Sequence, residues 1–257
     1  MTKQISSNNN PVVARPFLKW VGGKSQLLEQ LEEFFPQKFN NYLEPMVGGG
    51  AVFFYLRSTN RLKKRTFLLD VNKELINCYK IIKKNLNLLT EKLKELKRGY
   101  DKDAKGAFYS VRRWDRKKDF KKRMDIERAA RTIFLNKTCY NGLYRVNGKG
   151  QFNTPIGSYN DPNICDEENL YAVKKALKKT SLLAWDFEKI LDIVSAGDFV
   201  YFDPPYNPLN HTANFTSYTS NNFDKEDQKR LKDIFEKLTK IGCKVMLSNS
   251  DTNFIHH

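Results

Sequence analysis

The sequence predicts an α/β protein whose parallel sheet is interrupted by an inserted, mainly helical segment. Strand and helix signals alternate over residues 17–71, lysine-rich helical patterns fill the next stretch as far as about residue 165, and the alternation then returns. We therefore predict a discontinuous sheet domain formed by residues 1–72 and 166–257, with an inserted domain formed by residues 73–165.

The first part of the chain predicts a β-α-β unit. Apolar residues recur at helical spacing over residues 24–35, and Pro36 ends that pattern. Residues 42–44 form a short strand that runs into Val47-Gly48-Gly49-Gly50, and residues 51–56 begin a buried helix. A second buried strand is predicted over residues 65–71. Such a unit is the usual start of a parallel sheet.

The middle of the chain has a helical pattern. Residues 74–97 are predicted to form one long helix with many lysines on its exposed positions, and further helices are predicted over residues 108–118 and 126–136. A loop rich in Asn, Gly and Tyr follows over residues 138–162. The stretch carries much of the positive charge, and we interpret it as the inserted domain.

The last part of the chain returns to α/β alternation. Its predicted elements are a helix over 167–178, strands over 181–185 and 198–202, a polar loop over 207–223, a helix over 225–240 and a strand over 244–247.

The charge of the chain favours a polyanionic partner. There are 45 Lys and Arg residues against 29 Asp and Glu, which gives a net charge of +16. Binding of nucleic-acid phosphates is the commonest use of such an excess, with solvated helix faces as the alternative. An anionic membrane surface is a weaker alternative, because no basic helix has a strongly apolar opposite face.

Composition also narrows the class of protein. No apolar run is long enough to span a bilayer, and the first ten residues are polar, unlike a secretory signal. The four cysteines lie far apart without metal-ligand spacing, so we expect structural thiols, no metal site and a cytoplasmic location.

The glycine turn at residues 48–50 is a candidate nucleoside site. Gly48 and Gly50 lie between a predicted strand and a predicted helix, and Asp70 ends the next strand, 20 residues after Gly50. Glycines permit a sharp turn close to a ligand, and a carboxylate at that spacing can accept both hydrogen bonds of a ribose diol. A simple tight turn is the alternative interpretation.

Asp203-Pro204-Pro205-Tyr206 follows the predicted strand 198–202, and ligands of open α/β sheets bind at the carboxyl ends of strands. An exocyclic amine of a base is a poor nucleophile because its lone pair is delocalised into the ring. Two acceptors, a carboxylate and a neighbouring carbonyl, would favour a tetrahedral nitrogen, and Tyr206 could stack on a base extruded from the duplex. An acidic proline turn that merely ends a strand is the alternative.

These motifs resemble those of the Dam family of DNA adenine-N6 methyltransferases. Asp203-Pro204-Pro205-Tyr206 looks like the catalytic motif, the run from Glu44 to Gly50 resembles the cofactor motif, and the run from Pro16 to Lys24 resembles the additional cofactor motif. The runs 140–145 and 150–159 are similar to the GATC-reading hairpin of that family. The resemblance implies a class I S-adenosyl-L-methionine-dependent methyltransferase fold acting on double-stranded DNA, with no membrane and no obligate protein partner.

The resemblance also implies residue roles. Trp20 and Lys24 would contact the methionine part of the cofactor, Asp70 its ribose, and Asp186 and Phe187 the region of its adenine. Asp203 would lie between cofactor and target amine. The positions expected to touch the recognition bases are Lys19, Leu143, Arg145, Pro155 and Tyr159. Arg145 suits a bidentate contact with guanine, Asn141 could bind a base edge or phosphate, and Tyr140 could fill the space left by the adenine.

The chain departs from the family pattern at its end. Members usually continue well beyond the Ser248-Asn249-Ser250 run with a final strand pair that completes the sheet, which this sequence lacks. From this we expect weak cofactor binding and poor methylation. Cytosine-N4 methylation and DNA binding without catalysis stay open as alternatives, and a nucleotide-dependent oxidoreductase is disfavoured because Asp203-Pro204-Pro205-Tyr206 would then have no role.

Overall fold

The computed structural model describes residues 12–205 and 223–249, and its centre is a parallel sheet. The strands are β1 (Tyr42–Glu44), β2 (Thr66–Leu69), β3 (Thr180–Leu183), β4 (Phe199–Phe202) and β5 (Lys244–Leu247), in the order β3-β2-β1-β4-β5. Every pairing between neighbours is parallel. Because β2 and β4 flank β1, the strand order reverses at β1, where open α/β sheets bind ligands. The predicted α/β sheet is confirmed.

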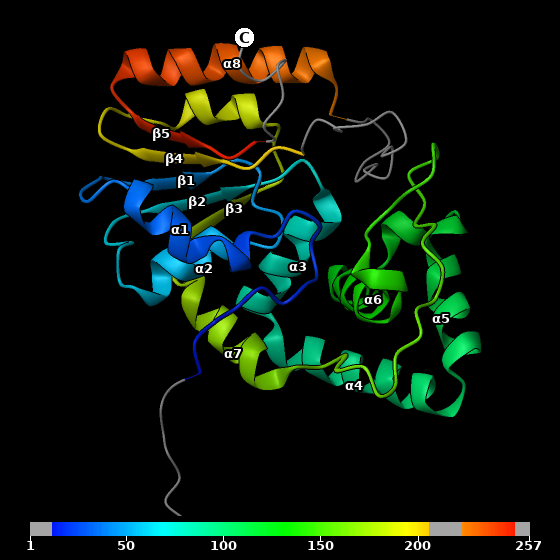
Figure 1. Ribbon diagram of the computed structural model, residues 1–257. Helices are drawn as coiled ribbons and strands as arrows, with labels where there is room; N and C mark the ends of the chain where they lie inside the picture. The colour runs from blue at the N-terminus through cyan, green and yellow to red at the C-terminus, as the bar shows by residue number, and fades with distance from the viewer. Residues whose placement is uncertain (1–11, 206–222, 250–257) are drawn as a thin grey trace, which may run out of the picture.

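Helices cover both faces of this sheet (Figure 1). Leu43, Val200 and Phe202 pack on one face against helix α8 (Lys225–Ile241) and the 3₁₀ helix η6 (Phe187–Asp192). Their chain neighbours Tyr42, Phe199 and Tyr201 belong to the core of the other face, as the alternation of side chains along a strand requires. That face carries α1, α2, α3 and α7.

The remaining helical elements overlap the predicted helices, except for two 3₁₀ turns over residues 120–122 and 140–142 that were not predicted. All the remaining helical elements are η1 (Lys24–Gln26), α1 (Leu28–Leu31), η2 (Glu32–Phe34), α2 (Ala51–Ser58), α3 (Lys73–Lys84), α4 (Leu86–Lys102), α5 (Ala104–Arg112), η3 (Arg113–Arg116), η4 (Phe120–Lys122), α6 (Asp125–Thr138), η5 (Tyr140–Gly142) and α7 (Glu167–Ala176).

Two predicted helices are wrong in their continuity. Residues 24–35 form three short turns, η1, α1 and η2. The long helix expected over 74–97 is broken at Asn85, whose backbone (φ −130°, ψ 40°) leaves the helical region. Leu86 and Leu89 beyond the break remain buried, so the apolar spacing continues across Asn85 although the helix axis changes. The Asn85 side chain makes no capping hydrogen bond to α4, and asparagine is a weak helix former in a helix interior.

Helices α3 to α6 and the loop that follows them lie between β2 and β3 in the chain, where the inserted segment was expected. Helix α3 packs against β3 and α7 and also against α6. Buried residues from both parts, such as Leu68 of β2 and Phe134 of α6, belong to one continuous core. The exact domain boundary at residues 72 and 73 therefore stays a prediction. None of the helices described is long and apolar enough to cross a membrane.

Candidate active site and recognition hairpin

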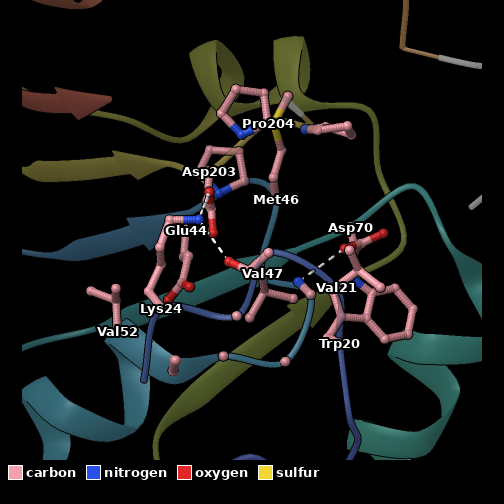
Figure 2. Close-up of a pocket in the computed structure, with 18 of the residues that line it drawn as sticks. Trp20, Val21, Lys24, Glu44, Met46, Val47, Val52, Asp70, Asp203 and Pro204 are labelled. Carbon is pink, nitrogen blue, oxygen red and sulfur yellow. Dashed lines mark hydrogen bonds and ion pairs between the residues drawn. The ribbon is translucent and has the colours of Figure 1, made fainter. Parts of the chain in front are cut away.

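A cavity of about 720 Å³ opens at the carboxyl ends of β1, β2 and β4 (Figure 2). All the residues predicted to bind cofactor line it, and so do Pro204, Pro205 and Lys19. The residues predicted to bind cofactor are Trp20, Lys24, Gly48, Gly50, Asp70, Asp186, Phe187 and Asp203. These residues come from segments far apart in the sequence, and the fold brings them into one place. Tyr206 lies outside the described residues.

The glycine turn after β1 forms the floor of the cavity. Gly48 (φ +48°) and Gly50 (φ +72°) both have the left-handed backbone that glycine adopts without strain. A Cβ on Gly48 would lie 2.7 Å from the Trp20 indole, and a Cβ on Gly50 would lie 2.7 Å from the Tyr79 hydroxyl. That hydroxyl donates to the Gly48 carbonyl at 3.0 Å. The turn therefore needs glycine both for its conformation and for its close packing.

Asp70 directly follows β2 and faces the glycine turn. Its Oδ2 accepts from Gly48 N–H at 3.1 Å, and its Oδ1 accepts from Asn72 N–H at 2.8 Å. Burial raises the pKa of Asp70 to about 6, although the two backbone hydrogen bonds act in the opposite direction. A carboxylate offers about four acceptor sites, so Asp70 can accept further hydrogen bonds from a ligand in the cavity.

Asp203 directly follows β4 and points toward Lys24 (Figure 2). The Lys24 ammonium donates to Asp203 Oδ1 at 2.5 Å and to the Gly22 carbonyl at 2.7 Å, and Lys24 is almost fully buried. Burial raises the pKa of Asp203 to about 6, and Lys24 limits that rise. The site thus holds a carboxylate that is ionised at neutral pH beside a buried positive charge.

Glu44 is a buried carboxyl beneath Asp203 that the sequence prediction did not assign to the site. It is the last residue of β1, and the Tyr42 hydroxyl donates to its Oε2 at 2.8 Å. Burial raises its pKa to about 8, and the nearby Asp203 charge also raises it. Glu44 is therefore mainly neutral at pH 7. Its place at the start of the run that resembles the cofactor motif was the signal that could have revealed it.

The far wall of the cavity is built around Arg230 of α8. Its guanidinium donates to Asp186 at 3.1 Å and to Glu188 at 2.7 Å, and it lies over the Phe187 ring at 4.9 Å from the centroid. Asp186 also accepts from the Glu188 N–H and so caps η6. These contacts hold Asp186 and Phe187 in fixed positions in the wall of the cavity.

The segment that contains Lys19 and Trp20 and the loop that follows α6 meet at one buried amide, the Asn136 side chain. The Asn136 Oδ1 accepts from Lys19 N–H, and its Nδ2 donates to the Lys19 and Gly142 carbonyls, all at 2.8 Å. Trp20 also stacks on Tyr144, with 5.6 Å between ring centroids. Asn136 was not among the predicted site residues. Its partners are backbone atoms, and one of them, Lys19, lies 117 residues away in the chain.

Residues 139–156 form an antiparallel hairpin, which we call the recognition hairpin. Its strands meet at the bridges Cys139–Ile156 and Val146–Phe152. The Arg145 Nε donates to Asn153 Oδ1 at 2.8 Å across the hairpin.

The other predicted base-contact residues lie on or beside this hairpin. Tyr140 is 57% exposed, and Asn141 has a left-handed backbone (φ +53°). The Tyr140 N–H donates to the Pro155 carbonyl, and the Leu143 carbonyl accepts from the Thr154 hydroxyl. Beyond the hairpin, the Tyr159 ring lies 4.4 Å from the Lys19 ammonium. The fold therefore gathers the predicted base-contact residues beside the cavity, with Tyr140 and Asn141 exposed.

The described residues contain no group of three or more His, Cys, Asp or Glu side chains that could hold a metal ion. Cys78 and Cys139 are buried, and all four cysteines are free thiols.

Comparisons with known proteins identify the family. Residues 20–257 match the model of the D12 class N6 adenine-specific DNA methyltransferases. The chain is 48% identical over 244 residues to the type II methyltransferase M.MjaIII of Methanocaldococcus jannaschii, which covers 92% of this chain and 84% of that protein.

Two further relatives are also DNA methyltransferases by name. The type II methyltransferase M1.LlaDCHI of Lactococcus lactis subsp. cremoris is 43% identical, over 95% of this chain and 84% of that protein. The DNA adenine methylase of Escherichia coli K12 is 35% identical, over 93% of this chain and 81% of that protein. The chain therefore belongs to the family of D12 class N6 adenine-specific DNA methyltransferases.

Proposed function

We propose that this adenine-specific DNA methyltransferase uses S-adenosyl-L-methionine to methylate adenine N6 within GATC, with Asp203 as the acceptor for the target amine. One observation carries the proposal: Asp203 lies at the end of β4 in the same cavity as the glycine turn and Asp70. A nucleoside site and an amine acceptor are thus next to each other.

The residues of the cavity suit S-adenosyl-L-methionine. Asp70 offers acceptors for a ribose diol, and the glycine turn allows close approach of a ligand because a Cβ there would meet Trp20. Phe187 offers an aromatic face for an adenine ring, and we assign Trp20 and Lys24, which also line the cavity, to the methionine part. When bound, the cofactor supplies an electrophilic methyl group on a sulfonium.

The chain's own residues would then activate the adenine amine. Asp203 Oδ1 is held by Lys24, so we assign Oδ2 as acceptor of one N6–H and the Pro204 carbonyl as acceptor of the other. Two acceptors would draw the nitrogen toward a tetrahedral geometry and free its lone pair for attack. Asp203, with a pKa of about 6, can take the proton that the nitrogen loses after transfer.

The recognition hairpin would read the DNA around that adenine. Arg145 suits guanine O6 and N7 in the major groove, and Lys19, Leu143, Pro155 and Tyr159 would contact the other bases. Tyr140 is exposed enough to fill the space left by an extruded adenine, and Asn141 beside it would bind a base edge or phosphate. The excess of Lys and Arg supplies the sequence-independent attraction to phosphates.

The preference for GATC rests on the hairpin residues that resemble the Dam family and on the similarity to the DNA adenine methylase of E. coli. The names of the two type II relatives favour a modification role in a restriction–modification pair. We further propose that the enzyme works on DNA in the cytoplasm without an obligate protein partner.

The test is methyl transfer from tritiated S-adenosyl-L-methionine to short duplexes that contain GATC or a single-base variant of it. Digestion of the product to nucleosides separates N6-methyladenine from N4-methylcytosine. We expect label in N6-methyladenine with GATC duplexes and little with the variants. Label in N4-methylcytosine would refute the adenine assignment, and equal labelling of all adenine-containing duplexes would refute the GATC assignment.

A further inference from the structure

The outer edge of the recognition hairpin pairs with side chains instead of another strand. Val146 and Phe152 face each other, and the hydrogen bonds across the hairpin join the residues on either side of that pair. Phe152 therefore turns its own N–H and C=O away from the partner strand. Because Phe152 is only 1% exposed, these two backbone groups need partners within the protein.

Two adjacent residues of η3 supply those partners. Asp115 Oδ2 accepts from the Phe152 N–H at 2.8 Å, and Arg116 Nη2 donates to the Phe152 carbonyl at 2.6 Å. Arg116 also bonds to Asp115 Oδ1. The acidic and basic side chains together thus offer Phe152 one acceptor and one donor, as a neighbouring strand would.

The helical core fixes the position of Asp115. Arg131 of α6 donates to Asp115 Oδ2 at 2.6 Å, and the two side chains are only 3% and 7% exposed. Arg131 is itself held by the Val111 carbonyl at 3.2 Å. A carboxylate that is buried, paired and bonded in this way has little freedom to move, so the backbone of Phe152 is tied to α6.

Hydrogen bonds also connect the residue after Phe152 to Arg145, the side chain expected to read guanine. Asn153 is the next residue; its N–H donates to the Arg145 carbonyl at 3.0 Å and its Oδ1 accepts from Arg145 Nε at 2.8 Å. The direction of the Arg145 guanidinium therefore depends on where Asn153 lies, and the position of Asn153 depends on Phe152.

We propose that Asp115 and Arg116 are positioning residues for sequence discrimination, because they orient Arg145 through Phe152 and Asn153. The inference rests on the proposed function of the recognition hairpin. Neither residue is assigned a contact with a base or with the cofactor, so their effect is on selectivity and not on cofactor binding.

Asp115→Asn tests the proposal, with Glu74→Gln as a matched control. Glu74 also pairs with an arginine of α6, Arg128, but at the junction of α6 with α3. The measurement is the Kd for a single-base variant divided by the Kd for the GATC duplex, both by fluorescence anisotropy with the cofactor analogue sinefungin present. We expect Asp115→Asn to reduce this ratio about tenfold, which is about 1.4 kcal/mol, and Glu74→Gln to leave it unchanged. An unchanged ratio in a folded Asp115→Asn protein would overturn the proposal.

Loss of the Asp115 charge leaves Arg131 buried without its counter-charge, which can prevent folding. In that event Arg116→Gln decides, because it removes the contact with the Phe152 carbonyl and leaves the Asp115–Arg131 pair. A lost phosphate contact would weaken binding of every duplex alike, whereas lost positioning narrows the gap between GATC and its variants. A smaller difference in affinity between GATC and its variants supports the proposal. Equal weakening of binding to all duplexes, or no change in any affinity, overturns it.

The wild-type protein separates this inference from the proposed function. If it binds and methylates all duplexes equally, the proposed GATC reading fails. If the wild type is selective and the Asp115→Asn and Arg116→Gln variants are equally selective, only the inference fails.

Discussion

The cavity at the strand ends and the recognition hairpin are built in different ways. In the cavity, Asp70 and Asp203 each follow a strand directly, and Gly48 lies in the turn after a strand, so the backbone of the sheet sets their positions. The hairpin has no neighbouring strand among the described residues and is held by side chains, among them the Asp115–Arg116 pair and Asn136. A site made by strand ends is specified locally, whereas a hairpin held by side chains depends on partners far along the chain.

The difference predicts separate consequences for substitutions. Changes in the cavity at residues other than Lys19, which is also assigned to a base contact, should impair chemistry or cofactor affinity and leave sequence selectivity intact. Changes in the hairpin should impair selectivity and leave cofactor affinity intact. The following predictions test this separation, from the largest expected effect to the smallest.

Asp203→Asn should lower the rate of methyl transfer at saturating cofactor about 10³-fold, as for loss of one preorganised electrostatic contact in other enzymes. The amide retains the shape of Asp203 but loses its charge and one acceptor. Asp186→Asn changes a carboxylate of the same cavity that lies away from Lys24, and should retain most of the rate. Single-turnover transfer of tritium measures both. A rate for Asp203→Asn within about tenfold of wild type would contradict the assigned role.

Gly48→Ala should weaken cofactor binding by roughly thirtyfold to several hundredfold, because strain and crowding each cost about 1–2 kcal/mol. Gly150→Ala is the control: Gly150 has the same left-handed backbone (φ +71°) but an added Cβ there would meet nothing within 4 Å. Calorimetric titration with sinefungin measures both affinities. Equal losses in the two variants would show that crowding against Trp20 is unimportant.

Arg145→Gln should reduce discrimination at the guanine position about tenfold and leave cofactor affinity unchanged. Arg113→Gln removes the same charge from an exposed position of η3 and should weaken binding of all duplexes alike. Anisotropy titrations with GATC and guanine-substituted duplexes measure the two effects. Loss of selectivity in Arg113→Gln, or its retention in Arg145→Gln, would remove Arg145 from the reading role.

The pH dependence should report the ionisation of Asp203. Its pKa is raised to about 6, so the carboxylate becomes protonated, and loses acceptor capacity, at a higher pH than an ordinary aspartate. The rate at saturating cofactor should therefore be half-maximal near pH 6 and rise to a plateau above it. Saturation is needed because Asp70, also with a pKa of about 6, would affect cofactor binding in the same range. A rate that does not change between pH 5 and pH 8 would contradict this assignment.

Much of the cavity could be predicted from the sequence, and much of the support for the hairpin could not. Gly48, Asp70 and Asp203 follow apolar strands at recognisable spacing, so local patterns placed them at one sheet edge. Asn85 broke a helix whose apolar spacing was intact, because spacing reports burial and not the direction of the axis. Asn136 and Asp115 act through partners many residues away, and no local pattern distinguishes a buried tie from a polar residue on a helix surface.

The most direct test of the account is a crystal structure of the enzyme with sinefungin and a GATC duplex. The account predicts an adenine extruded from the duplex, with its N6 about 3 Å from Asp203 and sinefungin against Asp70. An adenine still stacked in the duplex, or an extruded adenine whose N6 is bound by other groups while Asp203 stays with Lys24 alone, would contradict it.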